Sequence, residues 1–236
     1  MANKNQEREP RSRRAVAKRR PGRGSARRAR ASPAGAAPPA AVPAVSFNPF
    51  IAFPPAPPPR DDPRVLAPRD VLFGGRPHVV RPLEPADENR LISFFNSHTE
   101  ETIRQRYGYH ISEMTHERAR RLVGVDQSRD VALGVFERAP DGEEVLHAVG
   151  RYLLDATGRS AEMAFVVRES KRGLGICTAL LRTLLRIARQ RGMSFLYAQV
   201  QADNAPMLSI FRRHGGRLKP ILGADAMEVF VPTAPP

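Results

Sequence analysis

The chain has 236 residues with one cysteine, no tryptophan and a formal net charge of +14. A single cysteine excludes an intrachain disulfide, and no apolar run is long enough to span a membrane, so we expect no membrane span and a cytoplasmic location. The charge is uneven: residues 1–31 carry 12 Lys and Arg against two Glu, a net of +10, while the rest carries 26 against 22, a net of +4. Most of the basicity therefore belongs to an N-terminal tail.

The first 76 residues do not have the composition of a folded domain. Residues 1–31 are predicted to be a disordered basic tail, and residues 32–76 a Pro/Ala-rich linker, because residues 32–59 hold ten prolines and no charge. Two interpretations of the tail stay open. It is either a solubilising extension or an electrostatic arm for a polyanion such as nucleic acid, an acidic protein or an anionic membrane. No aromatic residue interleaves with its charges, which argues against base stacking.

Residues 77–236 are predicted to form one α/β domain, since about 160 residues suit a single mixed core. The pattern of apolar residues and turns predicts a mixed, mostly antiparallel sheet of six to seven strands flanked by helices. The expected strands are 78–83, 131–137, 145–154, 161–167, 194–201, 217–222 and 227–231, and the expected helices are 85–96, one starting at Thr99, 116–123, 177–189 and 206–214.

The most informative segment is an apolar strand that leads through a basic glycine loop into an amphipathic helix. Its loop consists of Arg172, Gly173, Leu174, Gly175, Ile176 and Cys177. Unpaired amides at a helix start carry partial positive charge, and glycines let a phosphate approach them, so this build favours a pyrophosphate site. The alternative is a glycine turn that only joins a strand to a helix.

The spacing of this loop identifies its class. GxxxxGK[ST] is absent, and GxGxxG fails because Thr178 stands where the third glycine belongs. RxxGx(G/A) fits from Arg172 onward, with Cys177 in the last position. Here the chain resembles the GNAT superfamily of N-acetyltransferases, and within it the acetyltransferase domain of bacterial Pat-type protein lysine acetyltransferases. Segments 79–107, 149–155, 161–170 and 202–216 follow in the order of that family.

The resemblance implies a GNAT fold and acetyl-CoA as cosubstrate, with its pyrophosphate on the loop. It also implies that a backbone amide of Phe165, Val166 or Val167 polarises the thioester carbonyl. Asn204 would hydrogen-bond the pantetheine arm, or serve as a helix N-cap before Pro206, and both roles are compatible.

An amine acceptor needs a group that takes its proton, and Glu162 is the candidate. Period-2 alternation places it on the same strand face as Ala164 and Val166, where apolar neighbours would raise the pKa of its carboxyl. The resemblance implies the same role, because Pat-type domains carry a glutamate here. The alternative is an exposed carboxylate at a strand end. Where many GNAT enzymes have a tyrosine acid, this chain has Phe211.

The sequence therefore predicts direct acetyl transfer from acetyl-CoA to an amine, most simply a protein lysine, with an acyl-CoA synthetase as one candidate protein partner. Two alternatives remain: a small-amine acetyltransferase, and a non-catalytic CoA-binding regulatory module. A covalent acetyl-cysteine route is not expected, because the only cysteine lies in the phosphate loop. The six histidines show no metal-ligand spacing, so no metal is expected.

Overall fold

An eight-stranded sheet organises the computed structural model, which describes residues 63–107, 113–139, 141–156 and 158–234. The strand order is β1-β2-β3-β4-β5-β6-β8-β7, and only the β5–β6 pair is parallel. The strands are β1 (Arg69–Phe73), β2 (Arg76–Pro82), β3 (Val131–Arg138), β4 (Glu144–Leu154), β5 (Ser160–Val167), β6 (Phe195–Gln201), β7 (Arg217–Pro220) and β8 (Ala226–Pro232). The predicted tail, residues 1–31, lies outside the described residues.

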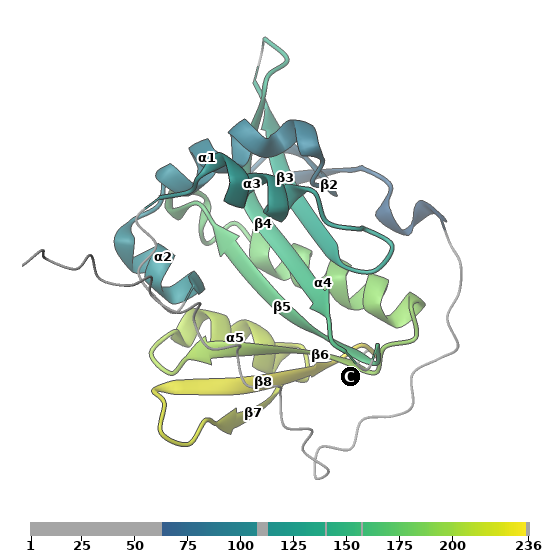
Figure 1. Ribbon diagram of the computed structural model, residues 1–236, viewed down its shortest axis with the longest axis vertical. Helices are drawn as coiled ribbons and strands as arrows, with labels where there is room; N and C mark the ends of the chain where they lie inside the picture. The colour runs from purple at the N-terminus through teal and green to yellow at the C-terminus, as the bar shows by residue number, and fades with distance from the viewer. Residues whose placement is uncertain (1–62, 108–112, 140, 157, 235–236) are drawn as a thin grey trace, which may run out of the picture. The chain divides into compact units, whose positions relative to one another are not determined.

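Helices cover both faces of the sheet. Figure 1 shows α1 and α3 in front of the strands and α4 behind them. The helices are α1 (Glu88–Asn96), α2 (Glu100–Tyr107), α3 (His116–Val123), α4 (Ile176–Gln190) and α5 (Ala205–Arg213), with short 3-10 turns at Pro63–Leu66, Pro85–Asp87 and Glu169–Lys171. The predicted helices and the strand-helix-strand crossover β5-α4-β6 are thus confirmed, with ends shifted by one to a few residues.

The two helical layers give the domain two hydrophobic clusters, one on each side of the sheet. Leu180, Leu181 and Leu184 of α4 are fully buried in the larger cluster, whereas Leu91 and Phe94 of α1 belong to the smaller one. Alternate residues of β3 enter the two clusters in turn, which explains why that strand is apolar on both faces.

The sheet begins earlier, and has more strands, than the sequence analysis expected. β1 lies inside residues 32–76, which were assigned to the linker, and it pairs with β2 through a turn at Gly74 and Gly75, both with positive φ. The predicted count of six to seven strands is therefore corrected to eight. An edge strand needs few apolar residues: Phe73 is buried, but Leu72 is 70% exposed, so the segment lacks a strong strand pattern.

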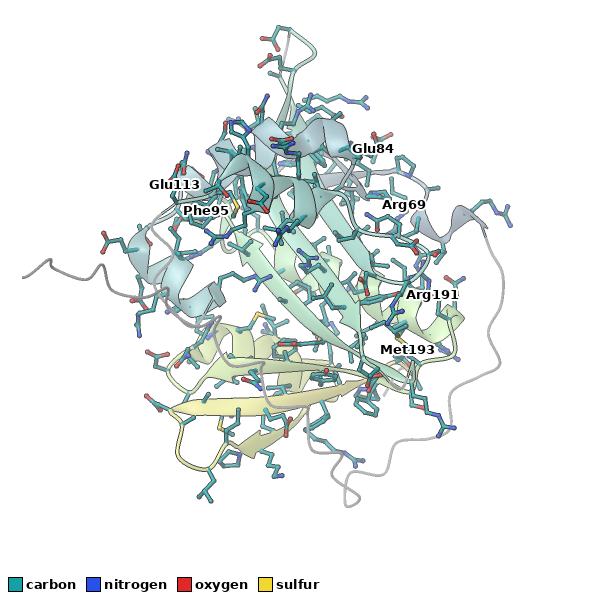
Figure 2. The ribbon with its side chains drawn as sticks, viewed as in Figure 1. Arg69, Glu84, Phe95, Glu113, Arg191 and Met193 are labelled. Atoms are coloured by element: carbon teal, nitrogen blue, oxygen red, sulfur yellow. The ribbon has the colours of Figure 1, made fainter. Side chains whose placement is uncertain are left out.

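The C-terminal end of α4 is anchored by Arg191. Its guanidinium donates hydrogen bonds to the Tyr152 hydroxyl at 2.7 Å and to the Gln127 carbonyl at 2.5 Å. Figure 2 labels Arg191 and, near it, Met193, whose amide bonds the Ala188 carbonyl at 3.0 Å. The anchor fixes the far end of α4 against β4, which helps to set the position of its N-terminus.

A buried carboxylate joins α1 to the sheet. Asp87 is 1% exposed and receives two hydrogen bonds from Arg81 of β2, at 2.7 and 2.9 Å, and one from Arg90 at 3.1 Å. Against the effect of burial, the Arg81 guanidinium holds the pKa of Asp87 below its usual range. Arg81 also donates to Glu144 at 2.7 Å and stacks over the Phe136 ring at 3.8 Å.

Replacement of Asp87 tests this anchor. We expect Asp87→Ala to lower the free energy of unfolding by about 3–5 kcal/mol, because it leaves part of a buried ion pair without its partner. The exposed pair of Arg121 and Glu117 is the matched control, and Glu117→Ala should cost less than about 1 kcal/mol. Urea unfolding at neutral pH measures both. Because the pKa of Asp87 is depressed in the folded state, its contribution should be lost as the pH falls through that pKa. Equal effects of the two substitutions would contradict this assignment.

Candidate active site

The candidate site lies where β5 and β6 part. The two strands pair at only three positions, Ser160 with Phe195, Ala161 with Leu196 and Glu162 with Tyr197, after which β5 continues beside β4 alone. Figure 1 shows the two strands together at one end and diverging toward the other. A cleft of about 480 Å³ opens between β5, the start of α4 and α5. Its wall includes Phe165, Val166, Val167, Arg172, Gly173, Gly175, Ile176, Cys177, Asn204 and Met207.

The glycine loop forms one end of this cleft. Gly173 and Gly175 have φ of +78° and +81°, and the space beside each Cα is open. These positive φ values favour glycine, and Gly175 immediately precedes α4. The unpaired amides at the start of this 15-residue helix therefore belong to the cleft wall, where they favour an anion.

Leu174 is the exception among the predicted cofactor residues. Its side chain packs against Gly74 at the β1–β2 turn, and it is absent from the cleft wall. The structure therefore brings together the other predicted residues of the loop, the strand and Asn204, whereas the Leu174 side chain is 39% exposed and lies beside Gly74.

Cys177 is held in a nonreactive state. Burial raises the pKa of its thiol to about 12, and its sulfur lies 3.5 Å from the sulfur of Met207 in α5. The thiol is therefore protonated at neutral pH and is a poor nucleophile. Its place in the first turn of α4 joins that helix to α5 across the wall of the cleft.

Glu162 lies at the vertex where the strands separate, as the last β5 residue that pairs with β6, and it is not itself among the residues of the cleft wall. It is half-buried, and burial raises the pKa of its carboxyl, opposed by the charge of Arg106 in α2. Tyr197, its partner on β6, is buried, and its pKa is raised to about 12 by that burial and by the negative charges of Glu162, Asp155 and Glu228. The vertex therefore combines a carboxyl of raised pKa with further acidic groups nearby.

Asn204 and Phe211 both belong to α5 or its cap. The Asn204 side-chain oxygen accepts a hydrogen bond from the Met207 amide at 3.2 Å, and Asn204 also lines the cleft. The N-cap role is thus confirmed, while the role toward a ligand stays a prediction. Phe211 is 1% exposed, with its ring 6.3 Å from that of Phe165 between centroids. The Phe211 side chain therefore belongs to the larger hydrophobic cluster.

Sequence reasoning missed Glu169, which fastens α2 to the glycine loop. Its carboxylate accepts hydrogen bonds from the Thr99 amide at 3.1 Å and the Thr102 hydroxyl at 2.6 Å, and contacts the His98 ring at 3.0 Å. Arg172 donates to the same Thr102 hydroxyl at 2.7 Å. Against the effect of burial, these bonds, that of Thr102 first, lower the pKa of Glu169 to about 2. Thr99 indicated a helix start, but nothing local indicated a partner some 70 positions away.

A second feature that sequence reasoning missed concerns two of the histidines, which show no metal-ligand spacing along the chain. His78 and His147 converge on Glu137, which also binds Lys171 of the loop. The hydrogen bond from Lys171 lowers the pKa of Glu137 to about 2, and burial lowers the pKa of His147 to about 4. These residues come from three strands, so their spacing along the chain carries no metal-ligand signal.

The described part of the chain contains no helix that is both long and apolar enough to cross a membrane.

Comparison with known proteins agrees with this geometry. The model of the acetyltransferase (GNAT) family matches residues 90–215. An acetyltransferase of Pseudomonas aeruginosa is 27% identical over 136 residues, which cover 58% of this chain and 73% of that protein.

Two solved structures share the fold. The GNAT domain of S. lividans PAT is 25% identical with a TM-score of 0.62, covering 70% of this chain and 96% of that domain. The spermidine N-acetyltransferase of Vibrio cholerae, solved with CoA and spermine, is 14% identical with a TM-score of 0.53, covering 66% and 95%. The second likeness supports the fold alone. Because the family match spans more than half of the sequence, the chain belongs to the GNAT acetyltransferase family.

Proposed function

We propose that this acetyltransferase moves the acetyl group of acetyl-CoA directly onto the side-chain amine of a protein lysine. The observation that carries the proposal is the cleft between β5, α4 and α5, which has a glycine loop at one end, together with Glu162 at the last β5–β6 pair, where the two strands part. The resemblance of the sequence to Pat-type protein lysine acetyltransferases supports a protein lysine as acceptor.

The cofactor residues divide by the part of acetyl-CoA that each would hold. The amides from Gly173 to Cys177 and the Arg172 guanidinium would hold the pyrophosphate, because a helix start and a cation both favour an anion. The backbone of β5 beyond Glu162 is not paired with β6, so Phe165, Val166 and Val167 would offer hydrogen bonds to the pantetheine arm and the thioester carbonyl. Asn204 would complete the contacts to the arm.

Glu162 would serve as the general base. It would accept a proton from the lysine ammonium, directly or through water, so that the neutral nitrogen attacks the thioester carbonyl. A β5 amide would stabilise the negative charge that develops on the carbonyl oxygen. The carbon–sulfur bond would then break, and the CoA thiolate would take a proton from water or from the new amide nitrogen. Phe211 offers no proton, and the protonated Cys177 does not take the acetyl group.

The acidic groups at the vertex support a cationic acceptor. Glu162, Asp155 and Glu228 all act on Tyr197 with negative charge, and burial raises the pKa of Glu228 itself. Carboxylates in a partly desolvated setting attract an ammonium group before it is deprotonated. A lysine side chain fits this environment, and so does a small polyamine, which makes the acceptor a question for experiment.

The first test concerns the cofactor. Gly175→Asp should abolish acetyl-CoA binding measured by calorimetry, because it places a carboxylate where the pyrophosphate would lie. Gly142→Asp is a matched control, since Gly142 also has positive φ with open space beside it but lies in the β3–β4 hairpin. It should bind acetyl-CoA as the parent does. Retained affinity in Gly175→Asp would refute the placement of the pyrophosphate.

The second test concerns Glu162. Glu162→Gln should lower kcat by about 10²-fold or more with little change in acetyl-CoA affinity, since general bases contribute roughly 10²–10⁴. The parent rate should fall as the pH drops through the pKa of Glu162, which lies above the ordinary carboxyl range, and the variant should lack this fall. Glu143→Gln, in the exposed hairpin, should match the parent. A Glu162→Gln variant with the parent's rate and pH profile would exclude this base.

The acceptor is tested with labelled acetyl-CoA. We expect the purified full chain to label specific lysines in lysate proteins, identified by mass spectrometry, and to do so faster than it labels spermidine or other small amines. Glu162→Gln in parallel separates enzymatic labelling from spontaneous acetylation. Labelling of small amines alone would identify a small-amine acetyltransferase, and acetyl-CoA binding without any turnover would identify a regulatory module.

A further inference from the structure

A cluster of two histidines and one glutamate lies on strands β2, β3 and β4, apart from the cleft. His78 and Glu137 are direct partners in the β2–β3 pairing. The pairing of β3 with β4 contains a bulge: Val135 pairs with Ala148 and Phe136 pairs with Leu146. His147, between these two β4 residues, therefore has no paired residue on β3. Such a bulge re-aims a side chain, and here it brings His147 beside Glu137.

The spacing of the three side chains fits one metal ion. The nitrogen Nε2 of His147 lies 2.9 Å from Oε2 of Glu137, and Nε2 of His78 lies 3.7 Å from the same oxygen. All three ligand atoms are within 4.8 Å of one another. Ligands at about 2.0–2.2 Å from a tetrahedral Zn²⁺ are about 3.4 Å apart, so small side-chain adjustments would bring these atoms to that geometry. Nε2 of His147 carries its hydrogen toward the Glu137 carboxylate, so metal binding would also require this hydrogen to move to Nδ1.

The hydrogen bonding of His78 orients its ring as a ligand. Its Nδ1 lies 2.9 Å from the Arg76 carbonyl, and because a carbonyl only accepts, Nδ1 carries the hydrogen. In the neutral ring the lone pair is then on Nε2, which is buried and has no hydrogen-bond partner among the described residues. A backbone carbonyl that fixes the far nitrogen of a histidine is the usual support of a metal-bound imidazole. The His78 side chain is fully buried, so this unpartnered nitrogen is not satisfied by bulk water.

A positive charge already occupies the open side of the cluster. The Lys171 ammonium lies 2.5 Å from Oε2 of Glu137, and Arg76 contacts Oε1 at 3.2 Å. Arg76 is 71% exposed, so its side chain has room to move away, and Lys171, which is 16% exposed, also lines the cleft into which its ammonium could turn. The ammonium satisfies the carboxylate but leaves the His78 nitrogen without a partner.

We propose that His78, Glu137 and His147 form a binding site for a divalent transition-metal ion, Zn²⁺ in the first place, which competes with the Lys171 ammonium for Glu137. Two imidazoles and one carboxylate select zinc and its neighbours over Mg²⁺ or Ca²⁺, which prefer oxygen ligands. Glu137 is partly exposed, so the fourth ligand position is open to water. The bound ion would cross-link β2, β3 and β4 behind the glycine loop.

The test uses the full chain, stripped of metal with a chelator and titrated with Zn²⁺ and with Co²⁺. We expect one ion per chain, a Co²⁺ absorption spectrum of tetrahedral nitrogen and oxygen coordination, and a higher melting temperature with zinc, because the ion binds the folded state. His147→Gln and Glu137→Gln should each weaken zinc binding by at least about tenfold. Lys171→Met should strengthen it, because it removes the competing ammonium.

His116→Gln is the matched control, since His116 also contacts a carboxylate, that of Glu88, but is exposed and lies on α3. It should bind zinc as the parent does. Circular dichroism of each variant identifies any that fails to fold. Lys171→Met keeps all three proposed ligands, so its zinc affinity tests the proposal even if a ligand variant does not fold. Absence of zinc binding by the parent overturns the proposal, whatever Lys171→Met does. Equal zinc affinity in the parent, His147→Gln and Glu137→Gln overturns it as well.

Discussion

The early end of pairing between β5 and β6 is the constraint on which the site depends. These strands are parallel and joined through α4, and they hydrogen-bond only from Ser160 to Glu162 on β5. Beyond that point the β6-facing backbone of β5 has no strand partner, and unpaired backbone groups need hydrogen bonds from some other source. An extended polar ligand can provide them. The same divergence opens the cleft and places Glu162 at the point where the two strands part. One feature of the sheet therefore positions both the unpaired β5 backbone groups and the Glu162 carboxyl.

The surrounding packing keeps this divergence in place. The buried leucines of α4 hold the helix against the sheet, while Arg191 fixes its last turn to Tyr152 on β4. At the other end, Gly175 gives the chain the left-handed turn from which the helix starts. The α4 N-terminus is thus held in place, and no side chain at Gly173 or Gly175 blocks access to its amides. This preorganisation lowers the entropic cost of binding an anion there.

Much of the fold was predictable because its signals are local. The helix over His116–Val123 and the long crossover helix follow from apolar periodicity and from caps such as Thr115, whose side chain accepts from the Arg118 amide. β1 was missed because an edge strand needs little apolar sequence. The strand that carries Glu162, the glycine loop and the helix after it were predictable because they follow one another directly in the sequence. Glu169 and the histidine cluster were not. Glu169 binds His98, which lies 71 positions away, and the cluster joins Glu137 to His78 of β2 and to His147 of β4, which only the pairing of the strands brings together.

The Glu169 carboxylate has a consequence for how this enzyme could change its specificity. It holds the start of α2, which carries Arg106 toward Glu162, and it borders the loop that begins α4. Substitutions that reshape the acceptor side through the first turn of α2 would therefore disturb the cofactor side as well. Substitutions in β6 and β8 around Tyr197 do not involve the Glu169 carboxylate. We therefore expect a new acceptor to be accommodated more easily by changes in these strands than by changes in α2.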